Sequence, residues 1–162
     1  MNAVESRLYK MKPGYVEEFD ELIKRFSQFG GGSSDEKYIH SKAFSNVYEF
    51  YIYAFFIGLY KDIKFDVSPD DKLKTFWEIE NWKPKDLVDY LFCCAIPKSD
   101  FKMFEVESMD DSGVRLEIDK VKGAIESYAN GGFDHINKVI KSDPSLVEKE
   151  FFFIELLAEA NS

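Results

Sequence analysis

The chain has 162 residues, of which 45% are hydrophobic and 31% are charged, and this balance is typical of a folded globular protein and excludes wholesale disorder. Its length suits one domain, so we expect a single globular domain over residues 1–162. The net charge is −9, made up of 0 over residues 1–30, −3 over 31–82 and −6 over 83–162, and no segment has the basic surplus that autonomous nucleic-acid binding needs.

The first predicted elements are a short extended segment and an amphipathic helix. Residues 1–14 alternate weakly between apolar and polar side chains, which favours a short strand or an extended arm. Over residues 15–29, apolar side chains recur at three- and four-residue steps and predict a helix: Val16, Phe19, Ile23 and Phe26. A glycine and serine run at 30–36 follows, and it lacks the lysine and hydroxyl offsets of a phosphate-binding loop, so we interpret it as a flexible connector.

Residues 41–60 are the most apolar stretch and contain eight aromatic residues. A helix that is apolar on nearly every face is normally the buried centre of its domain. A membrane span needs about 20 consecutive apolar residues, whereas Asn46 and Glu49 interrupt this run. We therefore expect a central core helix, with no membrane contact, in which Gly58 lets another segment pack closely.

Two helices that begin at prolines are predicted next. The first is a short helix at 69–79, and the second is a mostly buried helix that begins at Pro84 and ends at Pro97. Cys93 and Cys94 are adjacent, which does not fit the spacing of a zinc site, and we interpret them as buried apolar residues in a reducing compartment. Because the first residues also lack the apolar core of a signal peptide, the expected location is the cytoplasm.

The segment after residue 110 is predicted to contain a helix, a corner and a second helix. The apolar spacing over 114–129 indicates a helix, although alternation at its head leaves a strand at 114–118 as an alternative. Asn130 and Gly131 suit the left-handed conformation that ends helices. The sequence therefore predicts a corner there, followed by a separate helix over 133–140.

A final helix follows Pro144, with an acidic outer face and an apolar face made of Val147, Phe151, Ile154 and Leu157. Taken together, the elements predict a mainly α fold. We expect a single-domain bundle of about five to seven helices around the central helix at 41–60, with room for one short pair of strands.

Residues that could carry chemistry are few. Neither His40 nor His135 lies in a nucleophile motif, and we expect both to be surface or partly buried residues. Acidic residues are paired at Asp70 and Asp71, Glu78 and Glu80, Glu105 and Glu107, and Asp110 and Asp111. Such pairs are common in an acidic chain and stabilise helix starts. The sequence predicts no catalytic, cofactor-binding or metal-ligating residue, and a metal-dependent hydrolase or nuclease accessory that uses these carboxylates is an alternative.

Two short motifs and the order of segments around them carry a resemblance to a known family. The helix ending F-F-I-G-L-Y at 55–60, a polar connector, an apolar helix, and an acidic helix ending in Y-A-N-G-G-F at 128–133 are together similar to small proteins associated with Dnd systems. Those bacterial systems place phosphorothioate linkages in DNA and restrict DNA that lacks them. The resemblance covers roughly residues 38–141.

This resemblance implies a non-enzymatic accessory role in a bacterial DNA-modification or defence assembly. The expected partner is a protein, either a second copy or a defence-system component. The family pattern would have a more basic stretch after the first motif, where this chain has K-D-I-K-F-D-V-S-P-D-D-K at 61–72, so direct DNA contact is not expected. An acidic inhibitor that mimics the charge of DNA is a further alternative.

Overall fold

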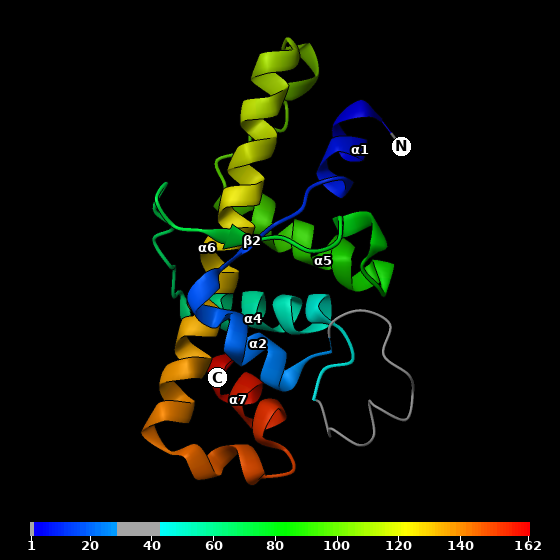
Figure 1. Ribbon diagram of the computed structural model, residues 1–162. Helices are drawn as coiled ribbons and strands as arrows, with labels where there is room; N and C mark the ends of the chain where they lie inside the picture. The colour runs from blue at the N-terminus through cyan, green and yellow to red at the C-terminus, as the bar shows by residue number, and fades with distance from the viewer. Residues whose placement is uncertain (1, 29–42) are drawn as a thin grey trace. The chain divides into compact units, whose positions relative to one another are not determined.

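The computed structural model describes residues 2–28 and 43–162, and these form two compact units (Figure 1). Unit 1 comprises Met1–Gly14 and Thr75–Glu126, and unit 2 comprises Tyr15–Lys74 and Ser127–Ser162. The described residues contain six α-helices and one two-stranded antiparallel sheet, which confirms the prediction of a mainly α fold. The single domain over 1–162 stays a prediction, and the connector at 30–36 lies outside the described residues.

Unit 1 contains three α-helical segments and three short 3-10 turns. The helices are α1 (Ala3–Tyr9), α5 (Lys85–Ala95) and the part of α6 (Asp111–Ser142) that ends at Glu126, and the turns are Ile79–Asn81, Ile96–Lys98 and Val106–Ser108. The prediction of a strand or extended arm at 1–14 is wrong. The reason is local, because the Asn2 side chain accepts a hydrogen bond from the Glu5 N–H at 2.7 Å and caps a two-turn helix that buries Leu8 and Tyr9.

Unit 2 contains the two-stranded sheet, three whole helices and the later part of a fourth. Its elements are β1 (Tyr15–Val16), α2 (Asp20–Phe26), α4 (Val47–Lys61), β2 (Leu73–Lys74), the later part of α6 and α7 (Phe152–Ala160). Tyr15 pairs with Lys74, and Val16 pairs with Leu73. Because Tyr15 and Val16 are in this strand, the helix predicted at 15–29 begins only at Asp20. The prediction of a helix at 69–79 is wrong, because the middle of that segment forms the partner strand.

Helix α4 is the buried centre of unit 2, as the aromatic run predicts. Phe50, Tyr51 and Phe55 have no exposed surface. The Phe50 ring stacks on Phe44 at 4.5 Å between centroids and meets the edge of Phe133 at 5.1 Å. The helix is shorter than the predicted 41–60, since it begins at Val47.

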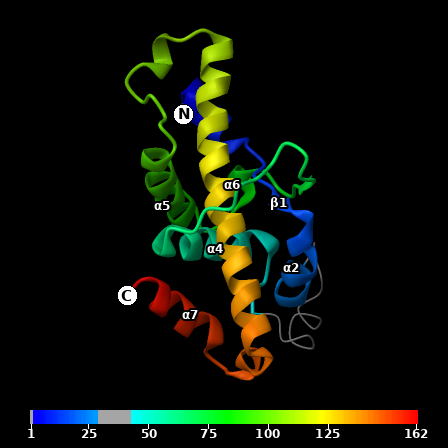
Figure 2. The same ribbon diagram turned by 90° about the vertical axis from the view of Figure 1, so that its left-hand side faces the viewer.

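The predicted corner at Asn130 and Gly131 is wrong, because α6 runs without a break from Asp111 to Ser142. The strand alternative at 114–118 is also wrong, since these residues belong to the same helix. Figures 1 and 2 both show α4 lying across the later part of α6. Two glycines inside a helix cost only about 1 kcal/mol each relative to alanine, and tertiary contacts can offset this cost.

Those contacts are close approaches of backbone to backbone. A Cβ atom on Gly132 would lie 1.8 Å from the carbonyl oxygen of Ala54, and one on Gly58 would lie 2.0 Å from that of Tyr128. A Cβ on Gly131 would lie 2.0 Å from the carbonyl oxygen of Ile63. The prediction that Gly58 allows close packing is therefore confirmed. Gly132 serves the same crossing from α6, and Gly131 lets α6 pack against the backbone just after the end of α4.

The other residues of that motif are also packing residues. Asn130 is fully buried and its side-chain oxygen accepts a hydrogen bond from the Val16 N–H at 2.8 Å. Phe133 is fully buried among aromatic rings, with centroids 6.4 Å from Tyr15 and 6.0 Å from Phe19. The motif that carries the family resemblance thus forms the packing centre of unit 2.

Helix α7 buries a different face from the predicted one. Phe151 and Ile154 are exposed, whereas Phe152, Leu156 and Ala160 are buried. Residues Pro144–Glu148 form a 3-10 turn, and the α-helix begins only at Phe152. Because a 3-10 turn has three residues per turn and not 3.6, an α-helical spacing counted from Val147 gives the wrong buried face. No helix among the described residues is long and apolar enough to cross a membrane.

Candidate functional site

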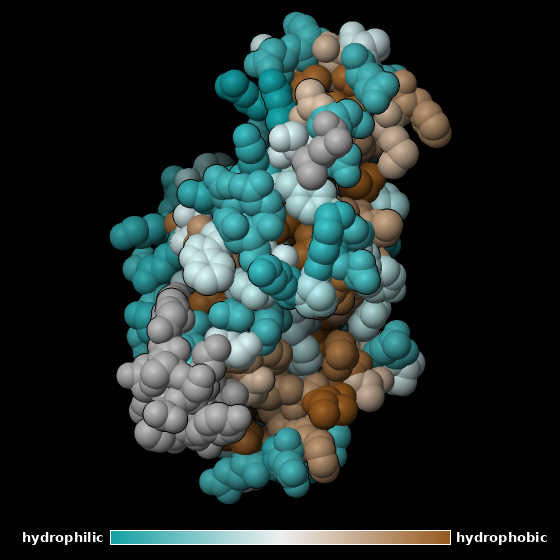
Figure 3. Space-filling view, turned by 90° about the vertical axis from the view of Figure 1, so that its right-hand side faces the viewer, coloured by the Kyte–Doolittle hydropathy of each residue, from teal (hydrophilic) through white to brown (hydrophobic). Residues whose placement is uncertain are grey.

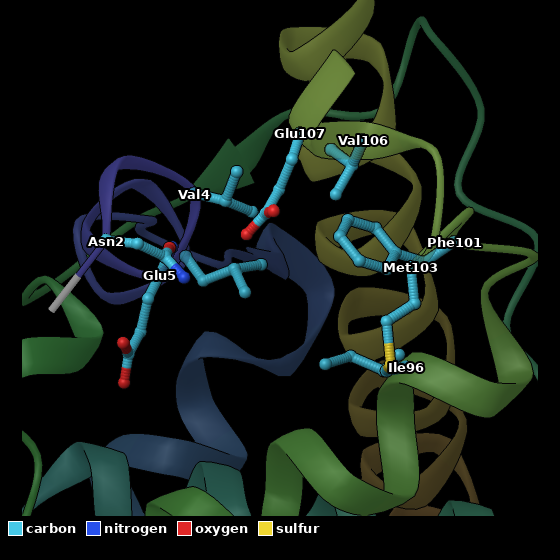
Figure 4. Close-up of a pocket in the computed structure, with 9 residues that line it drawn as sticks. Asn2, Val4, Glu5, Ile96, Phe101, Met103, Val106 and Glu107 are labelled. Carbon is cyan, nitrogen blue, oxygen red and sulfur yellow. The ribbon is translucent and has the colours of Figure 1, made fainter. Parts of the chain in front are cut away.

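A cavity with a volume of about 260 Å³ lies in unit 1 (Figure 4). One wall is α1 with the residue before it, and the other is the segment from Ile96 to Glu107. Most of its lining is apolar: Val4, Leu8, Ile96, Phe101, Met103 and Val106. The polar residues of the lining are Asn2, Glu5 and Glu107. Concave apolar surfaces with a few polar groups are the usual form of binding sites.

The α1 wall is attached to the rest of unit 1 at its C-terminal end. Arg7 donates a hydrogen bond to Asp111, at the first residue of α6, and this pairing lowers the pKa of the Asp111 carboxyl. The Tyr9 hydroxyl donates to Asp89 of α5, and burial together with this carboxylate raises the pKa of Tyr9 to about 12. The Tyr9 ring also meets the Phe92 ring edge-on, with centroids 5.2 Å apart. These contacts fix the position of a helix too short to be stable alone.

The second wall turns sharply after α5. Ser99 donates its hydroxyl to the Ile96 carbonyl at 2.7 Å, and Asp100 follows in the left-handed conformation with a φ of 59°. Glu117 of α6 then anchors the returning chain, because its carboxylate accepts the Lys102 N–H at 2.8 Å and the Lys120 ammonium at 2.6 Å. The Lys120 and Lys102 hydrogen bonds lower the pKa of Glu117, which keeps this 5% exposed side chain charged.

The polar part of the cavity is acidic. In Figure 4 the Glu107 carboxylate extends in the direction of Val4, whereas the Glu5 carboxylate points away from the Phe101 side. Both side chains are exposed. Neither carboxylate forms an ion pair or a side-chain hydrogen bond with any residue that the structure describes. The lining contains two acids and no base, so its charge is uncompensated within the cavity.

Two consecutive residues in the segment of the second wall are apolar and exposed, and the first of them lines the cavity. Met103 is 55% exposed and its neighbour Phe104 is 99% exposed. Figure 3 shows tan and brown residues at the upper end of the view, where the segment before α6 and the start of α6 lie. Exposed apolar side chains that lie together with an apolar cavity, as that of Met103 does, are typical of a surface that binds a partner.

The acidic pairs of the sequence are not gathered into one site. Asp110 caps α6 by accepting the Gly113 N–H at 2.8 Å, and Asp71 accepts the Ser68 N–H at 2.7 Å in a turn of unit 2. Lys102 lies 3.9 Å from Glu105 in an exposed ion pair. Over residues 2–28 and 43–162, no group of three or more histidine, cysteine or acidic side chains is placed to hold a metal ion.

The cavity lining contains no histidine or cysteine among the residues that the structure describes. His40 is outside the described residues, and His135 is half-buried in the later part of α6. Burial, with a smaller effect of Lys61, lowers the pKa of His135. The prediction that both cysteines are buried is wrong: Cys93 is exposed and Cys94 is partly exposed, because the buried face of α5 consists of Val88, Leu91, Phe92 and Ala95.

Sequence reasoning singled out Glu107 only as one half of an acidic pair and missed the rest of the cavity. No local pattern joins residues 2–8 to residues 96–107, since folding brings them together across about ninety positions. The spacing of Glu117 and Lys120 at three residues on a helix indicates an ion pair, but several other acid and base pairs of the chain have helical spacing too, so it does not single out this anchor.

The chain was compared with protein-family models, curated proteins and solved structures. None of the three comparisons gives a match.

Proposed function

We propose that the chain acts through protein contacts, as a non-enzymatic accessory protein whose binding site is the cavity of unit 1. The observation that carries this proposal is the apolar cavity whose lining includes the exposed side chain of Met103. Its volume of about 260 Å³ is below the roughly 300–1,000 Å³ of most small-molecule sites. A cavity of this size suits a side chain of a protein partner better than a cofactor.

The place of the protein in a bacterial DNA-modification or defence system is proposed from the resemblance over residues 38–141. Adjacent genes for DNA-sulfur chemistry would support this part of the proposal, and unrelated neighbours would count against it. The binding role of the cavity does not depend on this part.

Replacing Met103 by aspartate is expected to abolish partner binding. The change removes the apolar Met103 side chain from the lining and adds a third carboxylate to those of Glu5 and Glu107, so the apolar side chain of a partner would be buried against a charge. Because Met103 is 55% exposed, the fold should be unaffected. We expect immobilised Met103→Asp protein to retain at least about tenfold less of the partner than the unchanged chain, measured by quantitative capture from lysate of the source cells.

Leu116→Asp is the matched control, because Leu116 is 64% exposed on α6, is not part of the cavity lining, and undergoes the same change of charge. This variant should retain the partner as well as the unchanged chain does. The proposal fails if the purified chain stays monomeric and retains no protein, or if both aspartate variants behave alike.

A further inference from the structure

The carboxylates at the cavity define what kind of partner can bind there. Glu107 and Glu5 belong to the lining, no lysine, arginine or histidine does, and neither carboxylate is paired among the described residues. A partner that covers the cavity would remove these carboxylates from water. Loss of hydration is unfavourable for a charge that gains no counter-charge. A partner without a positive charge at this place would therefore bind poorly.

The apolar part of the lining defines a second requirement. Figure 4 shows the Phe101 ring and the Met103 side chain on one side of the cavity, with Met103 directed toward Ile96, and Val4 on the other side near the Glu107 carboxylate. An apolar side chain placed between these walls would bury its surface against them, and a cation attached nearby in the same partner would reach Glu107. The two requirements are thus adjacent in space.

We propose that the cavity of unit 1 binds a protein segment in which an apolar side chain is flanked by lysine or arginine. This inference rests on the proposed function, since it names the chemistry of the partner at the same site. A second copy of the chain is a poorer occupant, because it carries the same net charge of −9 and would be repelled. The complementary partner is a basic segment of a different protein.

The test uses three end-blocked fluorescent peptides and measures binding by fluorescence anisotropy. The first peptide has a central leucine flanked by lysines, the second has glutamate in place of each lysine, and the third has serine in place of the leucine. The unchanged protein should bind the first peptide at least about tenfold more tightly than the second or the third. Added salt should weaken this binding, since the carboxylates are exposed.

Charge-reversal variants locate the binding. Glu107→Lys should weaken binding of the leucine and lysine peptide about tenfold, because attraction is replaced by repulsion. Glu5→Lys should have a smaller effect, since its carboxylate points away from the Phe101 side. Glu80→Lys is the matched control: Glu80 is also exposed in unit 1 and lies outside the cavity lining, so this variant should change the affinity less than about twofold.

Several results would overturn the inference. Equal weakening by Glu80→Lys and Glu107→Lys would mean that the peptide follows the net charge of the protein rather than the cavity. Equal binding of the lysine and glutamate peptides would mean that the carboxylates select nothing. Absence of binding at about 1 mM peptide, the limit of weak affinity, would also reject it.

The outcome is separable from that of the proposed function. If no peptide binds but Met103→Asp still abolishes capture of a partner, the partner chemistry is wrong and the cavity remains the binding site. If Met103→Asp leaves capture unchanged, the cavity itself is wrong, whatever the peptides do.

Discussion

Replacing Gly132 by alanine is expected to lower the free energy of unfolding by roughly 3 kcal/mol, because the added methyl group has no space. Its Cβ would lie 1.8 Å from the carbonyl oxygen and 2.5 Å from the carbonyl carbon of Ala54. These atoms belong to the backbone of α4 and cannot rotate away, so α4 and the later part of α6 would have to separate. Urea denaturation followed by far-ultraviolet circular dichroism measures the loss.

Gly123 provides a control in the same helix. A Cβ at Gly123 would meet no atom within 4 Å, so Gly123→Ala should raise the free energy of unfolding by about 0.5–1 kcal/mol through helix propensity alone. If Gly132→Ala proved as harmless as Gly123→Ala, the close crossing of α4 and α6 in unit 2 would be incorrect.

Replacing Phe55 by alanine is expected to lower the free energy of unfolding by about 3–5 kcal/mol. The side chain has no exposed surface, and its ring meets Phe56 and Tyr128 edge-on at centroid distances of 5.2 and 6.1 Å. The variant would lose the burial of the ring, these aromatic contacts and the close packing around them. The same denaturation experiment measures the change.

Phe104→Ala is the control for this second change. It deletes the same ring from a position that is 99% exposed, so the free energy of unfolding should change by no more than about 0.5 kcal/mol. A loss of less than about 1 kcal/mol for Phe55→Ala would place α4 outside the core and contradict the fold of unit 2.

The parts of the fold that the sequence predicts well are those with a strong local signal. The aromatic run correctly predicts that α4 is buried. Pro84 and Pro97 predict the two ends of α5 to within a few residues. The acidic pair at Asp110 and Asp111 was correctly assigned to the start of a helix, where Asp110 caps α6. In each case neighbouring residues determine the local structure without help from distant contacts.

The errors arise where distant contacts outweigh local preference. Asn130 and Gly131 favour a helix end by themselves, but Asn130 is bonded to Val16 and Gly131 lies against the backbone of Ile63. The local pattern predicts a helix over 69–79, but Leu73 and Lys74 form a strand. Their pairing with Val16 and Tyr15 is a long-range contact that the local pattern does not contain. A single sequence contains no sign of either partner.

The candidate site was even less predictable than the fold. Its walls come from α1 and from the segment between α5 and α6, and the first of these was predicted as an extended arm. The anchoring carboxylate of Glu117 and the exposure of Met103 depend on how the chain turns at Asp100. Conversely, the two-glycine motif that attracted a functional interpretation is explained by packing in unit 2.

The most direct test of the binding role is site-specific photo-cross-linking in the cells that make the protein. A benzophenone side chain is introduced in place of Met103, at the cavity, or in place of Leu116, exposed on α6 outside it. We predict that irradiation links the position 103 variant to one protein partner through a basic segment, and that the position 116 variant gives no such product. A partner linked equally from both positions, or none from position 103, would contradict the assignment of the cavity as the binding site.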